Sequence, residues 1–134
     1  EKKWKFNCDV HDILKAPVKG SFDAAYSLDV IEHIPKAKKD IYMSNIVSSL
    51  AEDSVLIIGT PSLQSQTYAS EGSKIQHVHC MDHKMLRKLM LKYFKNVFLF
   101  SMNDEVVHTG FYPMPHYLFA MGVGVKGRRN NKKV

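Results

Sequence analysis

The sequence has little of what marks secreted or membrane proteins. Only two cysteines, Cys8 and Cys80, occur among 134 residues, and they form neither a disulfide scaffold nor a CxxC pair. No apolar run reaches the roughly 18 residues that a membrane span needs, and the first residues lack a signal-peptide pattern. We therefore expect a soluble protein of a reducing compartment, the cytoplasm.

The net positive charge is concentrated at the end of the chain, and the rest of the sequence is close to neutral. The formal net charge is +6, and five cationic side chains lie within the last nine residues. This distribution predicts one domain over residues 1–125 and a flexible basic tail over 126–134. A nucleic-acid-binding protein would instead spread its cations over a folded face. Terminal charge runs are usually solvated, so we do not expect nucleic acid as a partner; RNA binding through the tail is the alternative.

Hydrophobic periodicity predicts alternating strands and helices. Asp82 is a candidate N-cap for the second helix. The polar stretch 62–81 shows no clear periodicity and should be functional or partly helical, and a loop over 103–115 would join two antiparallel strands. The predicted strands are Trp4–Val10, Phe22–Leu28, Ser54–Gly59, Val97–Met102 and His116–Val123, and the predicted helices are Lys36–Ala51 and His83–Phe94.

One of these strands ends in a polar cluster. The segment 21–35, SFDAAYSLDVIEHIP, predicts a buried strand followed by Asp29, Glu32 and His33. Ligands of open α/β sheets bind at the carboxyl ends of parallel strands, so this cluster is a candidate site. Adjacent residues point in different directions on a helix, so we expect only one of Glu32 and His33 to face a cleft, and we choose His33.

The order of motifs resembles class I S-adenosylmethionine-dependent methyltransferases. A strand ending in NCDV is followed by FD…DVIEHI, then LIIGTPS, then H-V-H before an amphipathic helix. The resemblance implies an α/β fold: a truncated, Rossmann-like sheet of about five strands, mostly parallel, with a carboxyl-terminal antiparallel hairpin whose last strand inserts beside the parallel ones. The segment 101–120 also resembles a subgroup of bacterial methyltransferases.

The family's glycine-rich loop and the acidic residue that holds the ribose are not found in this sequence. We therefore expect a fragment, the carboxyl-terminal portion of such an enzyme, inactive alone. The family cofactor, S-adenosylmethionine, should bind it weakly or not at all, because the missing loop supplies backbone amides for the cofactor's amino-acid end.

The resemblance implies cofactor roles for four residues. Asp9 and Val10 would flank the adenine ring, one through its carboxylate and the other through its backbone amide; the alternative is that Asp9 caps a turn. Leu28 and Asp29 would lie beside the sulfonium, and the alternative for Asp29 is helix capping.

His33 is the candidate catalytic base, because an imidazole with an ordinary pKa of about 6.5 accepts protons near neutral pH. The alternative is a histidine that only hydrogen-bonds a neighbouring loop. If the chain is extended at 77–79, His77 and His79 share a face and both reach the cleft as substrate-binding residues.

The run H-x-H-C-x-x-H, residues 77–83, also suits zinc by residue type, but no second ligand cluster accompanies it, so we expect no metal site. Packing is the remaining interpretation. Tyr112 is a third candidate for substrate binding.

Three functions stay open at this point. The first is methyl transfer to a small-molecule acceptor, such as a sugar or another hydroxylated metabolite. The second is a non-catalytic protein-binding domain derived from the same fold, and the third is the RNA binding mentioned above. We also expect a homodimer through the amino-terminal strand edge, because the strands that would separate Trp4–Val10 from Phe22–Leu28 are not found in this sequence.

Overall fold

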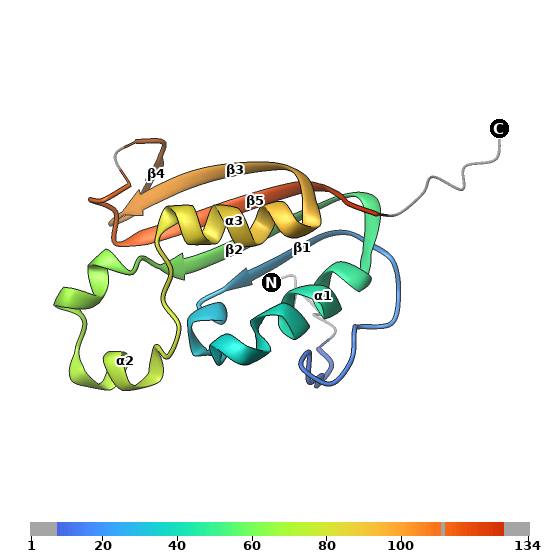
Figure 1. The fold of residues 1–134 in the computed structure, drawn as a ribbon, viewed down its shortest axis with the longest axis horizontal. Helices are drawn as coiled ribbons and strands as arrows, with labels where there is room; N and C mark the ends of the chain where they lie inside the picture. The colour runs from blue at the N-terminus through green and yellow to red at the C-terminus, as the bar shows by residue number, and fades with distance from the viewer. Residues whose placement is uncertain (1–7, 111, 128–134) are drawn as a thin grey trace, which may run out of the picture.

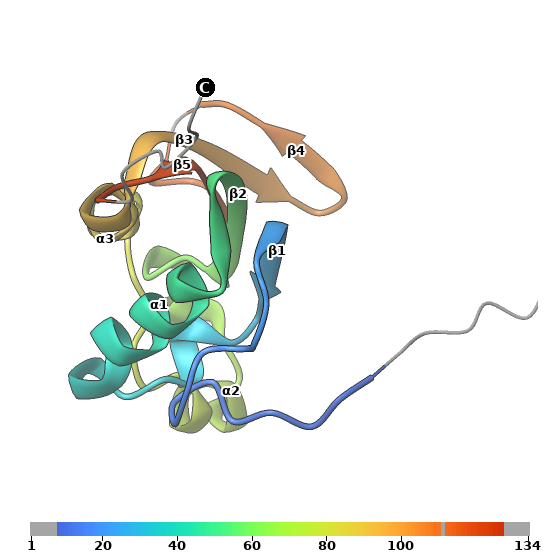
Figure 2. The ribbon, with the colours of Figure 1, turned by 90° about the vertical axis from the view of Figure 1, so that its right-hand side faces the viewer.

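The computed structural model describes residues 8–110 and 112–127 and contains one five-stranded sheet with helices on one face (Figures 1 and 2). The strands are β1 (Phe22–Leu28), β2 (Leu50–Pro61), β3 (Phe94–Asn103), β4 (Val106–His108) and β5 (Tyr117–Val125). The α-helices are α1 (Lys39–Ser48), α2 (Glu71–Gln76) and α3 (His83–Tyr93). Short 3-10 turns cover Ile31–His33, Lys36–Lys38 and Gln64–Tyr68.

The strand order is β1-β2-β5-β3-β4. β1 pairs parallel to β2, whereas β5 pairs antiparallel to both β2 and β3. The last strand is thus inserted between two strands that run in the same direction, as the resemblance implied. In Figure 1 the arrowheads of β1, β2 and β3 point to the end of the sheet where α2 lies.

The hydrophobic core lies between the sheet and the two longer helices. Figure 2 shows α1 and α3 on the same side of the sheet. Tyr42 and Met43 of α1 and Leu86 and Met90 of α3 are almost fully buried there, against β-strand residues such as Ile58. Alternation along the strands sends the intervening residues to the opposite face.

That opposite face is largely bare and apolar. It has a hollow of about 430 Å³ whose lining is entirely hydrophobic. The residues that line it come from all five strands: Tyr26, Leu28, Ile57, Phe100, Val107, Phe119 and Met121. Within the described residues, therefore, the sheet has helices on one face only.

Several predicted elements differ from the structure at their ends. The predicted strand over Phe22–Leu28 has the observed bounds, but it is an edge strand and mostly exposed instead of buried. The predicted helix over Lys36–Ala51 is too long, because Leu50 already pairs with Phe22 in the sheet. β2 and β3 extend beyond the predicted ranges at both ends, and β5 begins one residue later and ends two residues later than predicted, because pairing with neighbours sets their ends.

Two predictions about the strands were wrong or lie partly outside the structure. Most of the predicted strand Trp4–Val10 lies outside the described residues, and its remainder, Cys8–Val10, is not in a strand. The predicted loop over 103–115 contains β4, which pairs with the end of β3.

The stretch 62–81 is partly helical, as expected, and Asp82 caps α3 by accepting a hydrogen bond from the Met85 amide (2.7 Å).

β5 ends at Val125, the last residue of the predicted domain, and the division into domain and tail stays a prediction. Lys126 follows β5 and is held to the end of α3, donating from its backbone amide to the Tyr93 carbonyl (2.8 Å) and from Nζ to the Leu91 carbonyl (2.6 Å). The predicted tail beyond Gly127 lies outside the described residues. No helix among the described residues has the length and apolar character that crossing a membrane requires.

Candidate functional site

The polar cluster after β1 lies at the carboxyl ends of β1 and β2. Leu28 pairs with Gly59, and the Asp29 amide donates to the Gly59 carbonyl (3.1 Å). Asp29 then takes a left-handed backbone conformation (φ 54°), which Asp and Asn tolerate better than most residues. This turn directs the chain from β1 into the 3-10 turn Ile31–His33, so Glu32 and His33 lie beside the end of β2.

Glu32 is a fully buried carboxylate with one oxygen unsatisfied. Its Oε2 accepts a hydrogen bond from Thr60 Oγ1 on β2 (3.0 Å). Its Oε1 has no hydrogen-bond partner among the described residues and lies 3.8 Å from His33 Nε2. A buried carboxylate oxygen without a donor is costly, so this atom is an unusual feature of the fold.

Glu32 and His33 lie closer together than adjacent residues pointing in different directions on a helix would: Glu32 is fully buried, His33 is partly exposed, and Glu32 Oε1 lies 3.8 Å from His33 Nε2. The prediction for these two residues assumed a regular helix, whereas this segment is a single 3-10 turn. The glutamate extends inward to Thr60, and the histidine ring lies with Nε2 near the same carboxylate. Sequence reasoning set Glu32 aside, although its position three residues after Asp29 at a strand end marked it as part of the cluster.

His33 and His77 come together from opposite sides of the site. Their rings meet edge to face, with centroids 5.1 Å apart. His33 Nδ1 donates to the Gln76 carbonyl (3.1 Å), and His77 Nδ1 donates to Gln66 Oε1 (2.9 Å). In the neutral rings this leaves Nε2 as the nitrogen with a free lone pair. Thus His33 does hydrogen-bond a neighbouring loop and still has a free nitrogen.

His79 does not point to the same side of the chain as His77. Residues 77–79 form a turn after α2, not an extended strand. His79 is buried, its amide donates to the Glu32 carbonyl (3.0 Å), and both ring nitrogens lack partners among the described residues. Burial lowers its pKa, and the charges of Lys39 and Lys36 lower it further. Neighbouring Cys80 is also partly buried, and burial, followed by the Glu32 charge, raises its pKa to about 11.

A cavity of about 310 Å³ opens beside His77. Its walls combine aromatic, hydroxyl, amide and imidazole groups, which suits a polar small molecule. The lining residues are Pro61, Ser65, Gln66, Tyr68, Ala69, Ser73, His77, His116 and Tyr117. Burial, followed by the nearby Asp29 carboxylate, raises the pKa of Tyr117. Asp29 therefore lies beside this cavity.

Tyr112 is not part of this cavity. Its ring stacks on His83, with centroids 4.6 Å apart, and its hydroxyl donates to the Leu99 carbonyl (3.5 Å). The structure brings His77 to His33 but places Tyr112 against α3. The zinc-like run is also dispersed: among the described residues, the one group of three potential ligands joins His77 to Glu32 and His33, not to His79, Cys80 and His83.

Asp9 and Val10 lie in an exposed segment outside the sheet, and the Val10 side chain is fully exposed. Figure 2 shows this blue segment running away from the body of the molecule. In the structure, neither residue therefore lines a pocket with Leu28 and Asp29, because the strand that would carry them to the sheet edge is not formed over Cys8–Val10.

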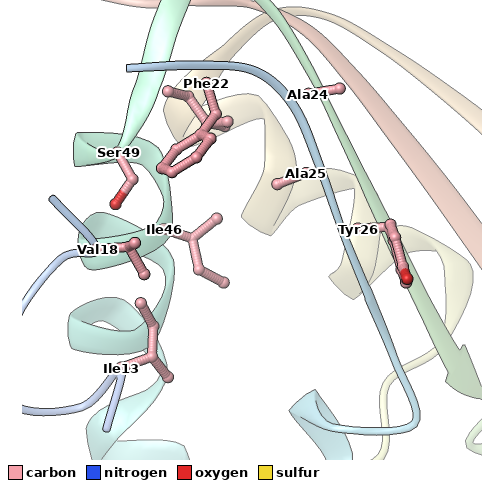
Figure 3. A pocket seen from close by; sticks show the side chains of 9 residues that line it. Ile13, Val18, Phe22, Ala24, Ala25, Tyr26, Ile46 and Ser49 are labelled. Atoms are coloured by element: carbon pink, nitrogen blue, oxygen red, sulfur yellow. The ribbon is translucent and has the colours of Figure 1, made fainter. Parts of the chain in front are cut away.

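A second cavity of about 310 Å³ lies at the opposite end of β1 (Figure 3). Figure 3 shows Ile13, Val18, Phe22 and Ile46 gathered between β1, the loop before it and α1. Apart from Ser49 and the Tyr26 hydroxyl its lining side chains are apolar, so it offers binding surface and no catalytic group.

Comparison with known proteins identifies the fold. No protein-family model and no curated protein matches the chain. Among solved structures, it is similar to an S-adenosylmethionine-dependent methyltransferase from Thermotoga maritima, described as a possible histamine N-methyltransferase, with a TM-score of 0.68 and 16% identity over 84% of this chain and 61% of that one.

Two further solved structures are also similar to this chain. The small RNA methyltransferase HEN1 has a TM-score of 0.65 and 16% identity, over 85% of this chain and 15% of that one. The N-methyltransferase NodS from Bradyrhizobium japonicum WM9, in complex with S-adenosyl-L-homocysteine, has a TM-score of 0.54 and 15% identity, over 85% of this chain and 52% of that one. The chain thus has the class I methyltransferase fold and spans less than two thirds of each neighbour.

Proposed function

We propose that this chain is the acceptor-side part of an S-adenosylmethionine-dependent methyltransferase that acts on a small hydroxylated metabolite, such as a sugar, in the cytoplasm. The observation that carries the proposal is the cluster of Glu32, His33 and His77 beside a polar cavity, at the end of the sheet where α/β folds bind ligands. Methyltransferase neighbours support the reaction class, and the aromatic and polar lining of the cavity supports a polar acceptor.

The cofactor side of this proposal rests on Leu28 and Asp29. The Asp29 carboxylate lies at the carboxyl end of β1, where a negative charge would favour a sulfonium cation. Asp9 and Val10 would reach the adenine ring only if their segment packs against the sheet edge. We therefore propose that the isolated chain binds S-adenosylmethionine weakly or not at all, and that the complete site belongs to a longer protein.

The acceptor side rests on His33. Its Nδ1 is fixed by the Gln76 carbonyl, and its free Nε2 faces the Glu32 carboxylate. S-adenosylmethionine, when bound in the longer protein, would supply the methyl group and would leave as S-adenosylhomocysteine. His33 Nε2 would take the proton that the acceptor hydroxyl loses, and the buried Glu32 carboxylate would stabilise the resulting imidazolium.

The test uses the longer protein that contains this chain. We expect Asp29→Asn and His33→Gln each to lower kcat/KM by about tenfold or more, since a positioned base contributes roughly 10²–10⁴-fold, with little change in melting temperature. Asn is chosen at position 29 because it tolerates the left-handed backbone. His108→Gln, on β4, is the matched control and should keep full turnover. Loss of stability without loss of turnover would give both residues a structural role only.

A further inference from the structure

Three side chains of the site direct potential metal-ligand atoms toward one another. Glu32, His33 and His77 each offer one potential ligand atom, and these atoms all lie within 4.8 Å of one another. Glu32 Oε1 is buried and without a hydrogen-bond partner among the described residues. The fold therefore holds a negative oxygen inside the protein, aimed at two imidazoles, without a proton donor to satisfy it.

The other atoms of these side chains are already fixed. Glu32 Oε2 accepts from Thr60, His33 Nδ1 donates to the Gln76 carbonyl, and His77 Nδ1 donates to Gln66. Metal-binding histidines characteristically donate their second nitrogen to a carbonyl or carboxylate, which fixes the ring and leaves the first nitrogen as ligand. Both histidines here have this arrangement, and Glu32 Oε1 is the third potential ligand atom.

We propose that Glu32 Oε1, His33 Nε2 and His77 Nε2 bind a divalent first-row transition metal ion such as Zn²⁺. Bonds of about 2.1 Å at tetrahedral angles place two ligand atoms of one ion about 3.4 Å apart. The Glu32–His33 separation of 3.8 Å exceeds this spacing by about 0.4 Å. A separation of at most 4.8 Å exceeds it by no more than about 1.4 Å, so binding of the ion requires small movements of the side chains.

The donor set selects the class of ion. Two imidazoles and one carboxylate suit zinc and iron-like divalent ions, whereas Mg²⁺ prefers oxygen ligands and water. Three protein ligands leave at least one coordination position open, as in catalytic zinc sites. Since His77 and Gln66 also line the polar cavity, that position is within reach of a molecule bound there.

This inference does not depend on the proposed methyl transfer, because the ligand geometry alone carries it. It does change the role of one residue: His33 Nε2 cannot hold a metal ion and accept a proton at once. In the metal-bound protein, the ion would lower the pKa of a coordinated hydroxyl in place of base catalysis by His33.

The test is metal titration of the 134-residue chain, freed of metal with a chelator and assayed without cofactor or acceptor. We expect calorimetry to find one Zn²⁺ per chain with a dissociation constant of about 1 μM or lower, Co²⁺ to give visible absorption bands of a site with nitrogen and oxygen ligands, and Mg²⁺ to bind far more weakly.

Variants identify the ligands. His77→Gln and Glu32→Gln should each weaken Zn²⁺ binding at least tenfold, and His108→Gln should change it less than twofold. His77 is only half-buried, so its variant remains informative if the buried Glu32 substitution disturbs folding, which circular dichroism would show. Absence of binding to the unmodified chain, or a loss of less than tenfold in His77→Gln, would overturn the proposal.

Gln66 is the proposed positioning residue, because it orients His77 without itself lying in the cluster. Gln66→Ala should weaken Zn²⁺ binding about tenfold, the lower end of the range for such partners, and Gln66→Glu should restore it. Equal affinity of the alanine variant and the unmodified chain would remove Gln66 from the site.

Discussion

Gly122 shows how one residue sets the packing between β5 and α3. A Cβ atom at this position would lie 2.5 Å from the Phe94 ring and 2.9 Å from the Met90 methyl group. Both side chains are fully buried, so neither can move into solvent. The absence of a side chain at Gly122 is what lets the Phe94 ring lie directly against β5.

We expect Gly122→Ala to destabilise the fold by roughly 1–3 kcal/mol, the usual cost of adding a methyl group to a filled core. Urea unfolding followed by circular dichroism measures this free energy. Gly72→Ala is the matched control: a Cβ there meets only the Ser70 hydroxyl, at 4.0 Å, and alanine favours the helix α2. Equal unfolding free energies for the two variants would contradict the packing argument.

At the scale of elements, an ion pair joins the first turn of α1 to the last turn of α3. Lys92 Nζ donates to both Asp40 oxygens (3.0 and 3.3 Å), and the Tyr93 hydroxyl donates to the same carboxylate (3.3 Å). The Lys92 hydrogen bond is the main reason that the pKa of Asp40 lies below 3.8. Burial, followed by the Asp40 charge, raises the pKa of Tyr93 to about 12.

The sign of the pH dependence follows from the lowered pKa of Asp40. A carboxyl group with a lower pKa in the folded state contributes stability above its unfolded pKa of 3.8, and this stability is lost as the pH falls through the lower folded value. Both partners are more than half exposed, so solvent screening keeps the contribution small, about 0.2–1 kcal/mol.

We therefore expect Asp40→Asn to lower the urea midpoint slightly at pH 6 and low salt, and to have no effect near pH 2 or in 1 M salt. Asp23→Asn, at an exposed carboxylate of β1, should leave the midpoint unchanged under all three conditions. If the Asp40 effect persists at pH 2, the ion pair is not its cause.

At the scale of the whole molecule, the sheet leaves two apolar surfaces without cover among the described residues. One is the face with the 430 Å³ hollow, and the other is the free edge of β1, which is the end strand of the sheet. Tyr26 belongs to both surfaces and is 78% exposed. Exposed apolar patches and open strand edges of this kind favour association with another chain.

We propose that two copies of the chain associate through the β1 edge with two-fold symmetry, because a self-complementary edge can pair with itself. Multi-angle light scattering should report a dimer at high concentration. Tyr26→Lys should give a monomer, since lysine on an edge strand opposes pairing. Ile75→Lys, at a similarly exposed position on α2, should remain dimeric. A monomeric unmodified chain with rapid hydrogen exchange over Phe22–Leu28 would refute this assembly.

Elements with local signals could be predicted from the sequence. A short, mostly apolar run marked β1 with its observed bounds, and Asp82 marked the start of α3, because an apolar run and a capping side chain involve only neighbouring residues. The motif order also indicated the methyltransferase fold, including the inserted last strand.

The composition of the site depends on packing between segments that are distant in the sequence. His33 and His77 are 44 positions apart, and they meet because the turn after α2 bonds to the turn after β1 through the Gln76 carbonyl and the His79 amide. The same packing separates His79 and Tyr112 from His77 and brings in Glu32. Strand ends also shifted, because pairing with partners distant in sequence extends a strand beyond its own local signal.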